Sequence, residues 1–361
     1  MKGQADNITM SGGGLYSLAT LGAKHVIDKT IPRVLDALAG APAAAPFTFS
    51  DMGCADGGTS LELWRSVIGH LRQSTTDDIQ VIYADQPRND FNALASITHD
   101  LTDFKSWLGE FQNVFALQSG ASFYTAITPA STLDLGFSAT AMHWLQRKPV
   151  DISGHVHMVG AEGKELEEFA RQAHADWSCI LLHRARELKP GGKLVFANFC
   201  RDESGQYLGA TSGVNMFDRF NSIWQQFVDD GTITNEEYQR MTLPQYYNTV
   251  EEFSAPFLQK DSEVFKAGLR LDSIETAQVV CPFAEDFKTH GDAVKFANEY
   301  LPTIRSWNES TFLAGLSVER EPEERREILE NYYDTYKRQV VEDPQQHRMD
   351  YVHAYMTISK I

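Results

Sequence analysis

The sequence predicts a doubly wound α/β fold, and three observations support this prediction. An apolar run that begins at Phe47 ends at Asp51 and leads into a glycine-containing turn over 53–58. The residues after the turn have helical spacing, with apolar side chains at Leu61, Trp64, Ile68 and Leu71. Apolar runs and helical patterns then alternate along the chain, which is typical of a parallel sheet with helices on both faces.

The N-terminal 46 residues precede the first predicted strand. We expect a helix over about 15–38, and Pro32 within it predicts a kink or a division into two helices. The Ala- and Pro-rich residues 39–46 predict a linker into the first strand.

Seven apolar runs predict strands at about 47–51, 79–84, 114–117, 133–137, 194–199, 271–280 and 351–358. Helical patterns separate them at about 59–73, 90–97, 162–188, 286–307 and 321–340, with a further helical patch near 103–110. The sequence Lys-Pro-Gly-Gly-Lys over 189–193 ends the long helix and begins the fifth strand.

Residues 203–265 interrupt the alternation, because they are largely helical and rich in aromatic side chains. Ligands of doubly wound folds bind at the carboxyl ends of the strands, so an insertion is expected to cover that edge. We therefore predict a core made of residues 1–202 and 266–361, and a helical cap made of residues 203–265.

Composition narrows the classes of partner. The 361 residues carry a formal net charge of −17, which opposes binding to nucleic acid or to an anionic membrane. No apolar run could span a bilayer and no leader pattern begins the chain, so we expect a cytoplasmic location. The four cysteines lack C-x-x-C spacing, and His155 and His157 fit a solvated loop better than a metal edge, so no metal is predicted.

The glycine turn carries information about the ligand. It does not read G-x-G-x-x-G, which disfavours the pyrophosphate of a nicotinamide dinucleotide and hence an oxidoreductase. Glycines allow a close approach of the backbone to a ligand, and Asp51 and Asp85 stand at the ends of two predicted strands. A carboxylate at Asp85 can accept both hydroxyls of a ribose. This arrangement favours S-adenosylmethionine over the alternative of a plain turn with a helix cap.

A series of short motifs is specific in combination: Met10–Gly14 with Tyr16–Ser17, Asp51–Cys54, Asp85–Asn92, Ser122–Tyr124, Ser138–Gln146, Pro190–Gly192 and Leu243–Tyr246. Over nearly the whole chain they resemble the SABATH family, the salicylic acid, benzoic acid and theobromine methyltransferases. The resemblance implies a Rossmann-like, seven-stranded class I methyltransferase sheet with a helical cap insertion. It also implies S-adenosylmethionine as cofactor, a small carboxylic acid as substrate and a homodimer. A microbial fatty-acid methyltransferase is one candidate within the family.

The same resemblance implies a cofactor site. Asp51 would lie near the methionine part, Asp85 would bind the ribose hydroxyls, and Phe123 would stack on the adenine. Thr59 stands where the family usually has Asn. The full implied set is Tyr16, Thr20, Asp51, Gly53, Thr59, Asp85, Gln86, Ser122 and Phe123.

The resemblance also implies a substrate site. His143 and Trp144 would face the transferred methyl group, and the Trp144 indole N–H would donate to the substrate carboxylate. The acyl pocket would be lined by Met216, Phe217, Tyr246, Ile304 and Trp307. By pattern alone, core packing is the favoured interpretation for each of these side chains. The resemblance shifts the preference toward the pocket for His143, Trp144, Met216 and Phe217, and less so for Ile304 and Trp307, while Trp224 stays with the core.

Two positions depart from the family pattern. Ala23 stands where the family has a Gln that helps to hold the carboxylate, and Lys24 and His25 are candidates to replace it. Thr140 stands where the family has a pocket Tyr, which favours a roomier or differently shaped pocket.

We predict an S-adenosylmethionine-dependent O-methyltransferase that converts small or medium-chain carboxylic acids to methyl esters. A carboxylic acid has a pKa near about 4, so it is already a nucleophilic anion at neutral pH and needs alignment rather than a base. The aliphatic character of the implied pocket favours free fatty acids over salicylate. The alternatives are N-methylation of a heterocycle and a non-catalytic S-adenosylmethionine-binding protein.

Overall fold

The computed structural model describes residues 15–39 and 45–361. The glycine motif at 10–14 and most of the predicted linker lie outside the described residues. The chain forms one seven-stranded sheet in the order β3-β2-β1-β4-β5-β7-β6. Its strands are β1 (Phe47–Met52), β2 (Ile79–Ala84), β3 (Val114–Ser119), β4 (Leu133–Ala139), β5 (Leu188–Phe199), β6 (Leu269–Val279) and β7 (Tyr351–Lys360). The first five strands are parallel, and β7 is antiparallel to both β5 and β6.

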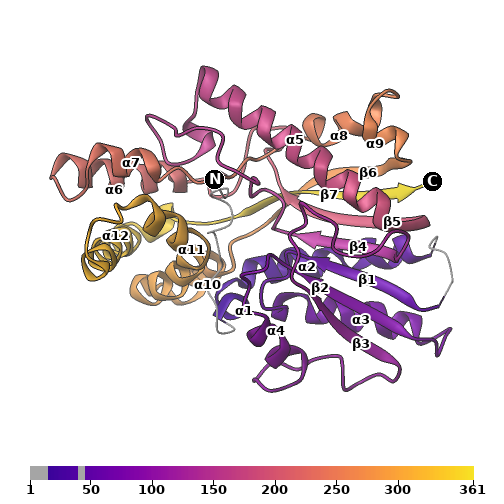
Figure 1. Cartoon of the computed structure of the whole chain (residues 1–361). Coiled ribbons are helices and arrows are strands. Elements are labelled where there is room, and N and C mark those ends of the chain that lie inside the picture. Colours follow the sequence, from indigo (N-terminus) through magenta and orange to yellow (C-terminus); the bar gives the residue numbers. More distant parts are fainter. Residues whose placement is uncertain (1–14, 40–44) are drawn as a thin grey trace.

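Helices cover both faces of the sheet (Figure 1). On one face, α2 (Leu21–Leu38) packs against α3 (Leu61–Leu71) and against β4, β5 and β7. On the other face, α5 (Gly163–Glu187) packs against α8 (Val250–Leu258) and α9 (Glu263–Lys266). All residues of β1 and β4 are buried, as expected for central parallel strands that are covered on both sides. The seven strands and the alternating helices confirm the predicted fold class.

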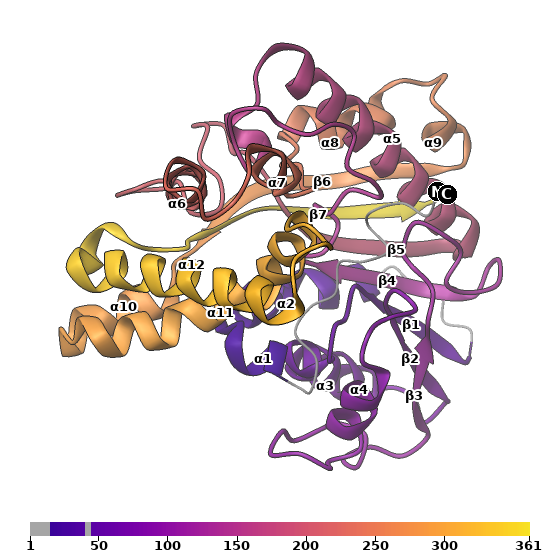
Figure 2. The ribbon, with the colours of Figure 1, turned by 60° about the vertical axis from the view of Figure 1, so that its left-hand side comes forward.

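A group of helices lies beyond the end of the sheet toward which the parallel strands run (Figures 1 and 2). It consists of α6 (Met216–Asp229), α7 (Asn235–Arg240), α10 (Pro282–His290), α11 (Ala293–Gly315) and α12 (Pro322–Glu342), which pack on one another. The segment 203–265 therefore divides: α6 and α7 join this group, whereas α8 and α9 pack on the sheet layer. We propose that the functional cap combines α6 and α7 with α10–α12.

Several element boundaries differ from the prediction. The N-terminal helix is interrupted at Thr20, between α1 (Leu15–Ala19) and α2, and α2 continues through Pro32. The prediction of a helical patch near 103–110 is wrong. After α4 (Phe91–Thr98) this segment forms bends and turns, and Trp107 within it is buried. The solvated loop predicted for His155 and His157 is also wrong, because both side chains are buried beneath the cap.

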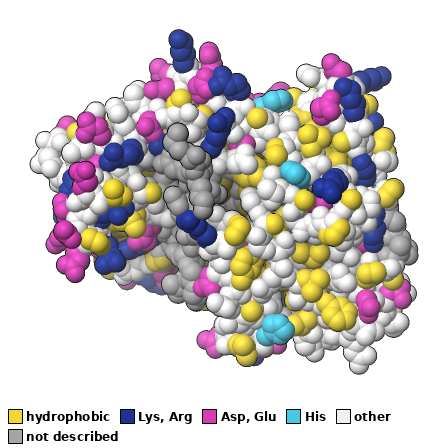
Figure 3. Space-filling model, viewed as in Figure 1, with side chains coloured by type: hydrophobic (Ala, Val, Ile, Leu, Met, Phe, Trp, Pro, Cys, Tyr) yellow, Lys and Arg dark blue, Asp and Glu magenta, His cyan; other side chains and the backbone are white. Residues whose placement is uncertain are grey.

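One face of the molecule carries both charged and hydrophobic side chains. Figure 3 shows acidic and basic side chains interspersed over one face of the molecule, with hydrophobic side chains gathered where β1 to β3 lie. Phe115 and Leu117 of the edge strand β3 are 47% and 43% exposed. None of the described helices is both long enough and apolar enough to cross a membrane.

Candidate active site

The glycine turn, residues 53–58, lies at the carboxyl ends of the central strands, where the strand order reverses between β1 and β4. Gly53 has φ +75°, and a Cβ there would lie 2.4 Å from the Cβ of Ala141. Gly57 has φ +74°, and its Cβ would meet Leu94 at 2.5 Å. Glycine is required at both positions, because only glycine combines this backbone conformation with so close an approach.

Acidic side chains surround the turn and hold it in shape. Asp85 accepts hydrogen bonds from the N–H groups of Ala55 (2.8 Å) and Gln86 (2.7 Å). Asp51 accepts from Ser60 Oγ (2.5 Å) and Trp64 Nε1 (3.1 Å). Burial raises the pKa of Asp51 to about 6 and also raises the pKa of Asp85.

A third acid, Asp56, was not predicted. Its carboxylate accepts from the backbone N–H and the hydroxyl of Ser17 and from Gly58 N, and so fixes α1 over the turn. Three carboxylates oppose a phosphate ligand and suit a ligand that carries ribose hydroxyls and positive charge. These acidic acceptors therefore fit S-adenosylmethionine.

The predicted adenine loop lies beside the turn and is held from behind. Arg184 and Glu187 of α5 form a fully buried ion pair, with Nε 2.7 Å from Oε2. Arg184 also donates to the carbonyls of Phe123 (2.9 Å) and Thr125 (2.8 Å). The Phe123 ring lies within 3.7 Å of the position of a Cβ built on Gly53. Ser122 precedes it in the same loop, and Gln86 and Thr59 follow the ends of β2 and β1, so the implied cofactor residues converge at one edge.

A small cavity of about 40 Å³ lies next to this edge, between the core and the cap. We call it the central cavity; it is lined by Tyr16, Thr20, Ala23, Thr140, His143, Trp144, Phe199, Leu208, Gln245, Trp307, Met349 and Tyr351. None of these side chains is acidic or basic apart from His143. Burial lowers the pKa of His143 to about 3, so its imidazole is neutral at physiological pH.

The structure brings five predicted residues together at the central cavity: Tyr16, Thr20, His143, Trp144 and Trp307. Four others lie elsewhere. Met216, Phe217 and Ile304 are buried in the cap without lining the cavity, and Phe217 packs behind Trp307 with ring centroids 6.3 Å apart. Tyr246 points away, and its hydroxyl donates to Glu252 Oε1 at 2.8 Å. Trp224 is fully buried and stacks on Tyr332, which agrees with its predicted core position.

Tyr124 links the two halves of the site. Its hydroxyl donates to the carbonyl oxygen of Trp144, so the loop at the cofactor edge helps to place the indole of the central cavity. Trp144 is further held by an antiparallel bridge to Gln245, because Tyr246 N donates to His143 O (2.9 Å) and Leu145 N to Pro244 O (2.8 Å).

Sequence reasoning missed Gln245, Tyr351 and Asp56. Gly22 could have indicated that a large side chain packs closely against α2. A Cβ at this helical glycine would lie 2.1 Å from the ring of Tyr351. Gln245 was missed because one of its two side-chain partners, His157, is 88 residues away in the sequence; the other is its near neighbour Tyr247.

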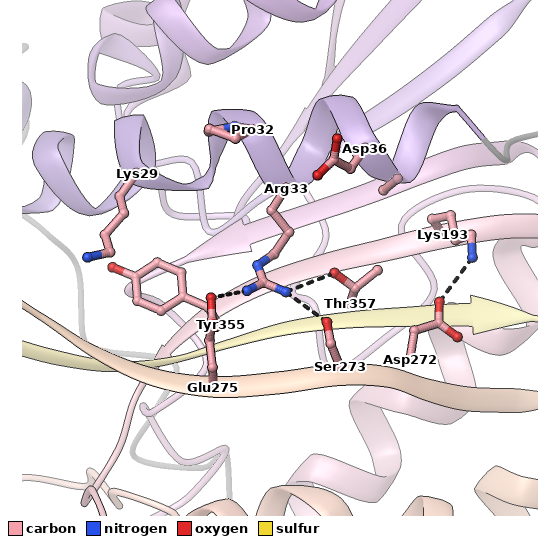
Figure 4. A pocket seen from close by; sticks show the side chains of 11 residues that line it. Lys29, Pro32, Arg33, Asp36, Lys193, Asp272, Ser273, Glu275, Tyr355 and Thr357 are labelled. Atoms are coloured by element: carbon pink, nitrogen blue, oxygen red, sulfur yellow. Dashed lines mark hydrogen bonds and ion pairs between the residues drawn. The ribbon is translucent and has the colours of Figure 1, made fainter.

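A wider cleft of about 470 Å³ lies between α2 and the β6–β7 edge (Figure 4). Several of its charged groups pair within the cleft: Arg33 donates to Ser273 (2.8 Å) and Thr357 and pairs with Glu275, and Lys193 pairs with Asp272 at 3.0 Å. The cleft is separate from the glycine turn, so we do not assign the active site to it.

One group of possible metal ligands occurs among the described residues: Asp286, His290 and Glu299. The ammonium group of Lys295 lies 2.8 Å from Asp286 Oδ2 and 3.8 Å from Glu299 Oε1. The group is thus already paired with a cation of the chain, and we assign no metal to it.

The strand order, the acidic glycine turn and the neutral cavity define a class I methyltransferase fold with a capped site. Comparison with known proteins gives the family. The family model described as SAM dependent carboxyl methyltransferase matches residues 13–361, and the chain therefore belongs to this family. The match confirms the resemblance to the SABATH methyltransferases.

Relatives are distant. Indole-3-acetate O-methyltransferase 1 of Arabidopsis thaliana is 26% identical over 250 residues, which cover 63% of this chain and 64% of that protein. The protein of the same name from Oryza sativa subsp. japonica is 23% identical over 393 residues, covering 99% of this chain and 91% of that protein. A solved structure, loganic acid methyltransferase with SAH, is 20% identical with a TM-score of 0.73, covering 97% of this chain and 98% of that chain. This likeness shows that the fold is shared.

Proposed function

We propose that the protein is an S-adenosylmethionine-dependent O-methyltransferase that converts carboxylic acids to methyl esters. The observation that carries the proposal is a cavity lined by His143 and Trp144 with no lysine, arginine or acid among its described lining residues, at the sheet edge that also holds the acidic glycine turn. When bound, S-adenosylmethionine supplies a methyl group on a positively charged sulfur. The acidic turn suits that positive charge, and the neutral cavity suits a substrate anion that the same charge attracts.

The residues of the central cavity position the acid and do not take its proton. Trp144 would donate to one carboxylate oxygen and leave the other oxygen free to attack. His143 is neutral, because burial lowers its pKa to about 3, and it packs edge-on against Phe199 at 4.8 Å. The carboxylate is ionised in solution, so alignment in a dry site supplies the acceleration, roughly 7–11 kcal/mol in favourable systems.

The acid must displace protein side chains to bind. A cavity of about 40 Å³ is smaller than any ring or acyl chain that such an enzyme would methylate. We infer that Trp307 and Tyr16, which line the cavity from α11 and α1, move apart when the acid enters.

We propose an apolar acid as the substrate, with a free fatty acid of small or medium chain length preferred over salicylate. Leu208, Met349 and Phe199 line the cavity, and the buried Met216 and Ile304 extend the apolar surroundings into the cap. Relatives named for indole-3-acetate and loganic acid make cyclic acids the rival class. The homodimer and the cytoplasmic location remain predictions from the resemblance and the composition.

Methyl transfer from labelled S-adenosylmethionine to a panel of aliphatic, benzoic and indolic acids tests the proposal. We expect labelled methyl esters, with aliphatic acids giving the highest kcat/KM. Trp144→Phe should lower kcat/KM at least about tenfold, as for a hydrogen bond to a charged group, while the Kd of S-adenosylmethionine stays unchanged. Binding of the cofactor with no ester from any acid would overturn the enzyme proposal. Methylation of xanthine-like bases alone would select the N-methyltransferase alternative.

A further inference from the structure

We propose that Gln245 is the second donor of the carboxylate clamp, the pair of side-chain N–H groups that hold the substrate carboxylate, with Trp144 as the first. The inference rests on the proposed function, because it names a further residue that touches the acid.

The second hydrogen-bond donor of the clamp is missing at Ala23, the position where the family has a Gln. Ala23 lines the central cavity, but its methyl group cannot donate a hydrogen bond. The two neighbouring candidates are directed elsewhere: Lys24 Nζ lies 2.5 Å from Asp28 Oδ2, and His25 is exposed on α2. Neither lines the cavity, so a second donor has to come from another part of the chain.

Gln245 is placed to fill this gap. It forms an antiparallel bridge with Trp144, and residues directly opposite in such a bridge project their side chains to the same face. Both side chains line the central cavity, and Gln245 is only 1% exposed. The indole and the amide therefore reach the cavity from adjacent chain segments.

The orientation of the Gln245 amide is fixed by two groups behind it. Val159 N–H donates to His157 Nδ1 at 3.4 Å, so the neutral imidazole carries its proton on Nε2. That nitrogen lies 3.2 Å from Gln245 Oε1, and the Tyr247 hydroxyl donates to the same oxygen at 3.3 Å. Two donors hold the oxygen, which turns the amide nitrogen away from them.

The Gln245 amide nitrogen has no hydrogen-bond partner among the residues that the structure describes. His157 cannot reverse the arrangement by becoming a cation, because burial lowers its pKa well below the usual value. It is also stacked on Phe217, with ring centroids 3.8 Å apart. His157 and Tyr247 are thus positioning residues for a donor that faces the cavity.

Two neutral N–H donors suit the chemistry better than a cation would. They fix the carboxylate plane while leaving its negative charge, and hence its nucleophilicity, largely intact. A site built around such donors discriminates strongly against ligands that lack the carboxylate, because its buried N–H groups would then stay unpaired.

Gln245→Glu is the sharpest test, because it keeps the oxygen that His157 and Tyr247 bind and exchanges only the donor. At pH 8 we expect kcat/KM for the acid to fall about 100-fold, with the KM of S-adenosylmethionine within about twofold of wild type. Near pH 5.5 the variant should recover relative to wild type, because a protonated Glu can donate again. A purely structural role would give no such recovery.

Gln226→Glu, the same exchange of an amide for a carboxyl on the exposed face of α6, is the matched control and should leave kcat/KM unchanged. In the swap variant Ala23→Gln with Gln245→Ala, an amide returns at the family position, and we expect at least about tenfold recovery over Gln245→Ala alone.

The outcomes separate this inference from the proposed function. If the wild-type protein makes the ester and kcat/KM of Gln245→Glu at pH 8 is within about threefold of the wild-type value, the inference is overturned and the proposed function stands. No ester from the wild-type protein would overturn the function itself. If Gln245→Glu does not fold, Tyr247→Phe replaces it: a fall of about three- to tenfold in kcat/KM supports the clamp, and an unchanged value contradicts it.

Discussion

The glycine turn and the central cavity differ in whether their polar side chains already have hydrogen-bond partners within the chain. At the turn, Asp51, Asp56 and Asp85 are acidic side chains that already accept hydrogen bonds from the chain. In the cavity, the Trp144 indole and the Gln245 amide are neutral donors with no bonded acceptor among the described residues. The first region is preformed by its own contacts, whereas the second is completed by what binds there.

This difference indicates a division of labour. The positive charge of the donor molecule balances the acids of the turn. The same charge attracts an anion into a cavity whose described lining residues include no lysine or arginine. Binding of the acid is therefore expected to depend on the cofactor, while binding of the cofactor does not depend on the acid. The predictions below test this contrast, beginning with the preformed region.

Removing Arg184, the buried cation behind the adenine loop beside the turn, should have the largest effect. Arg184→Met leaves the carboxylate of Glu187 buried and releases the carbonyls of Phe123 and Thr125. We expect a loss of about 3–5 kcal/mol in the free energy of unfolding, measured with denaturant. Arg171→Met, which breaks an exposed pair, is the control and should cost at most about 1 kcal/mol. Equal losses of unfolding free energy in both variants would show that the buried ion pair stabilises the fold no more than the exposed one.

Removing an acid of the turn should weaken the binding of S-adenosylmethionine. Asp85→Ala deletes the acceptor for Ala55 N–H and for ribose hydroxyls, so we expect a roughly 100-fold higher Kd for S-adenosylmethionine by calorimetry. This corresponds to about 2.7 kcal/mol. Asp77→Ala, an exposed aspartate before β2, should leave the Kd unchanged. An unaltered Kd in Asp85→Ala would mean that the cofactor binds elsewhere.

The two regions should also respond oppositely to pH, with a smaller effect. The folded pKa of His143, about 3, lies below its unfolded value, so its contribution to stability is lost as pH falls below about 6.5. The folded pKa of Asp51, about 6, lies above its unfolded value, so its contribution is lost as pH rises through 6.

Between pH 7 and 5, His143→Gln should therefore reduce the acid-induced loss of unfolding free energy by about 2 kcal/mol, and Asp51→Asn should increase it by about 1 kcal/mol. Denaturant titrations at both pH values measure this, with His25→Gln as an exposed control. Shifts of the same sign in the two variants would contradict the contrast between the regions.

Local patterns were enough to predict the core of this fold. The apolar run at 79–84 matches β2 residue for residue, and the acidic strand ends at Asp51 and Asp85 meet at one edge because parallel strands end together. Contacts made by the cap were not predictable in this way. His157 looks like a loop residue in the sequence, and only the packing of Phe217 and Gln245 from distant segments shows it to be buried. Gln245 and Tyr246 are adjacent in the sequence. The bridge between Gln245 and Trp144 places Gln245, and not Tyr246, at the cavity.

The central claim is that the protein aligns a preformed anion with a methyl donor and needs no base. The dependence of single-turnover methyl transfer on pH, at saturating S-adenosylmethionine, tests it most directly. We predict a rate that rises only with ionisation of the acid, near about pH 4, and is flat from pH 6 to 9. A further tenfold rise per pH unit between 6 and 8 that disappears in His143→Gln would show general-base catalysis and contradict the claim.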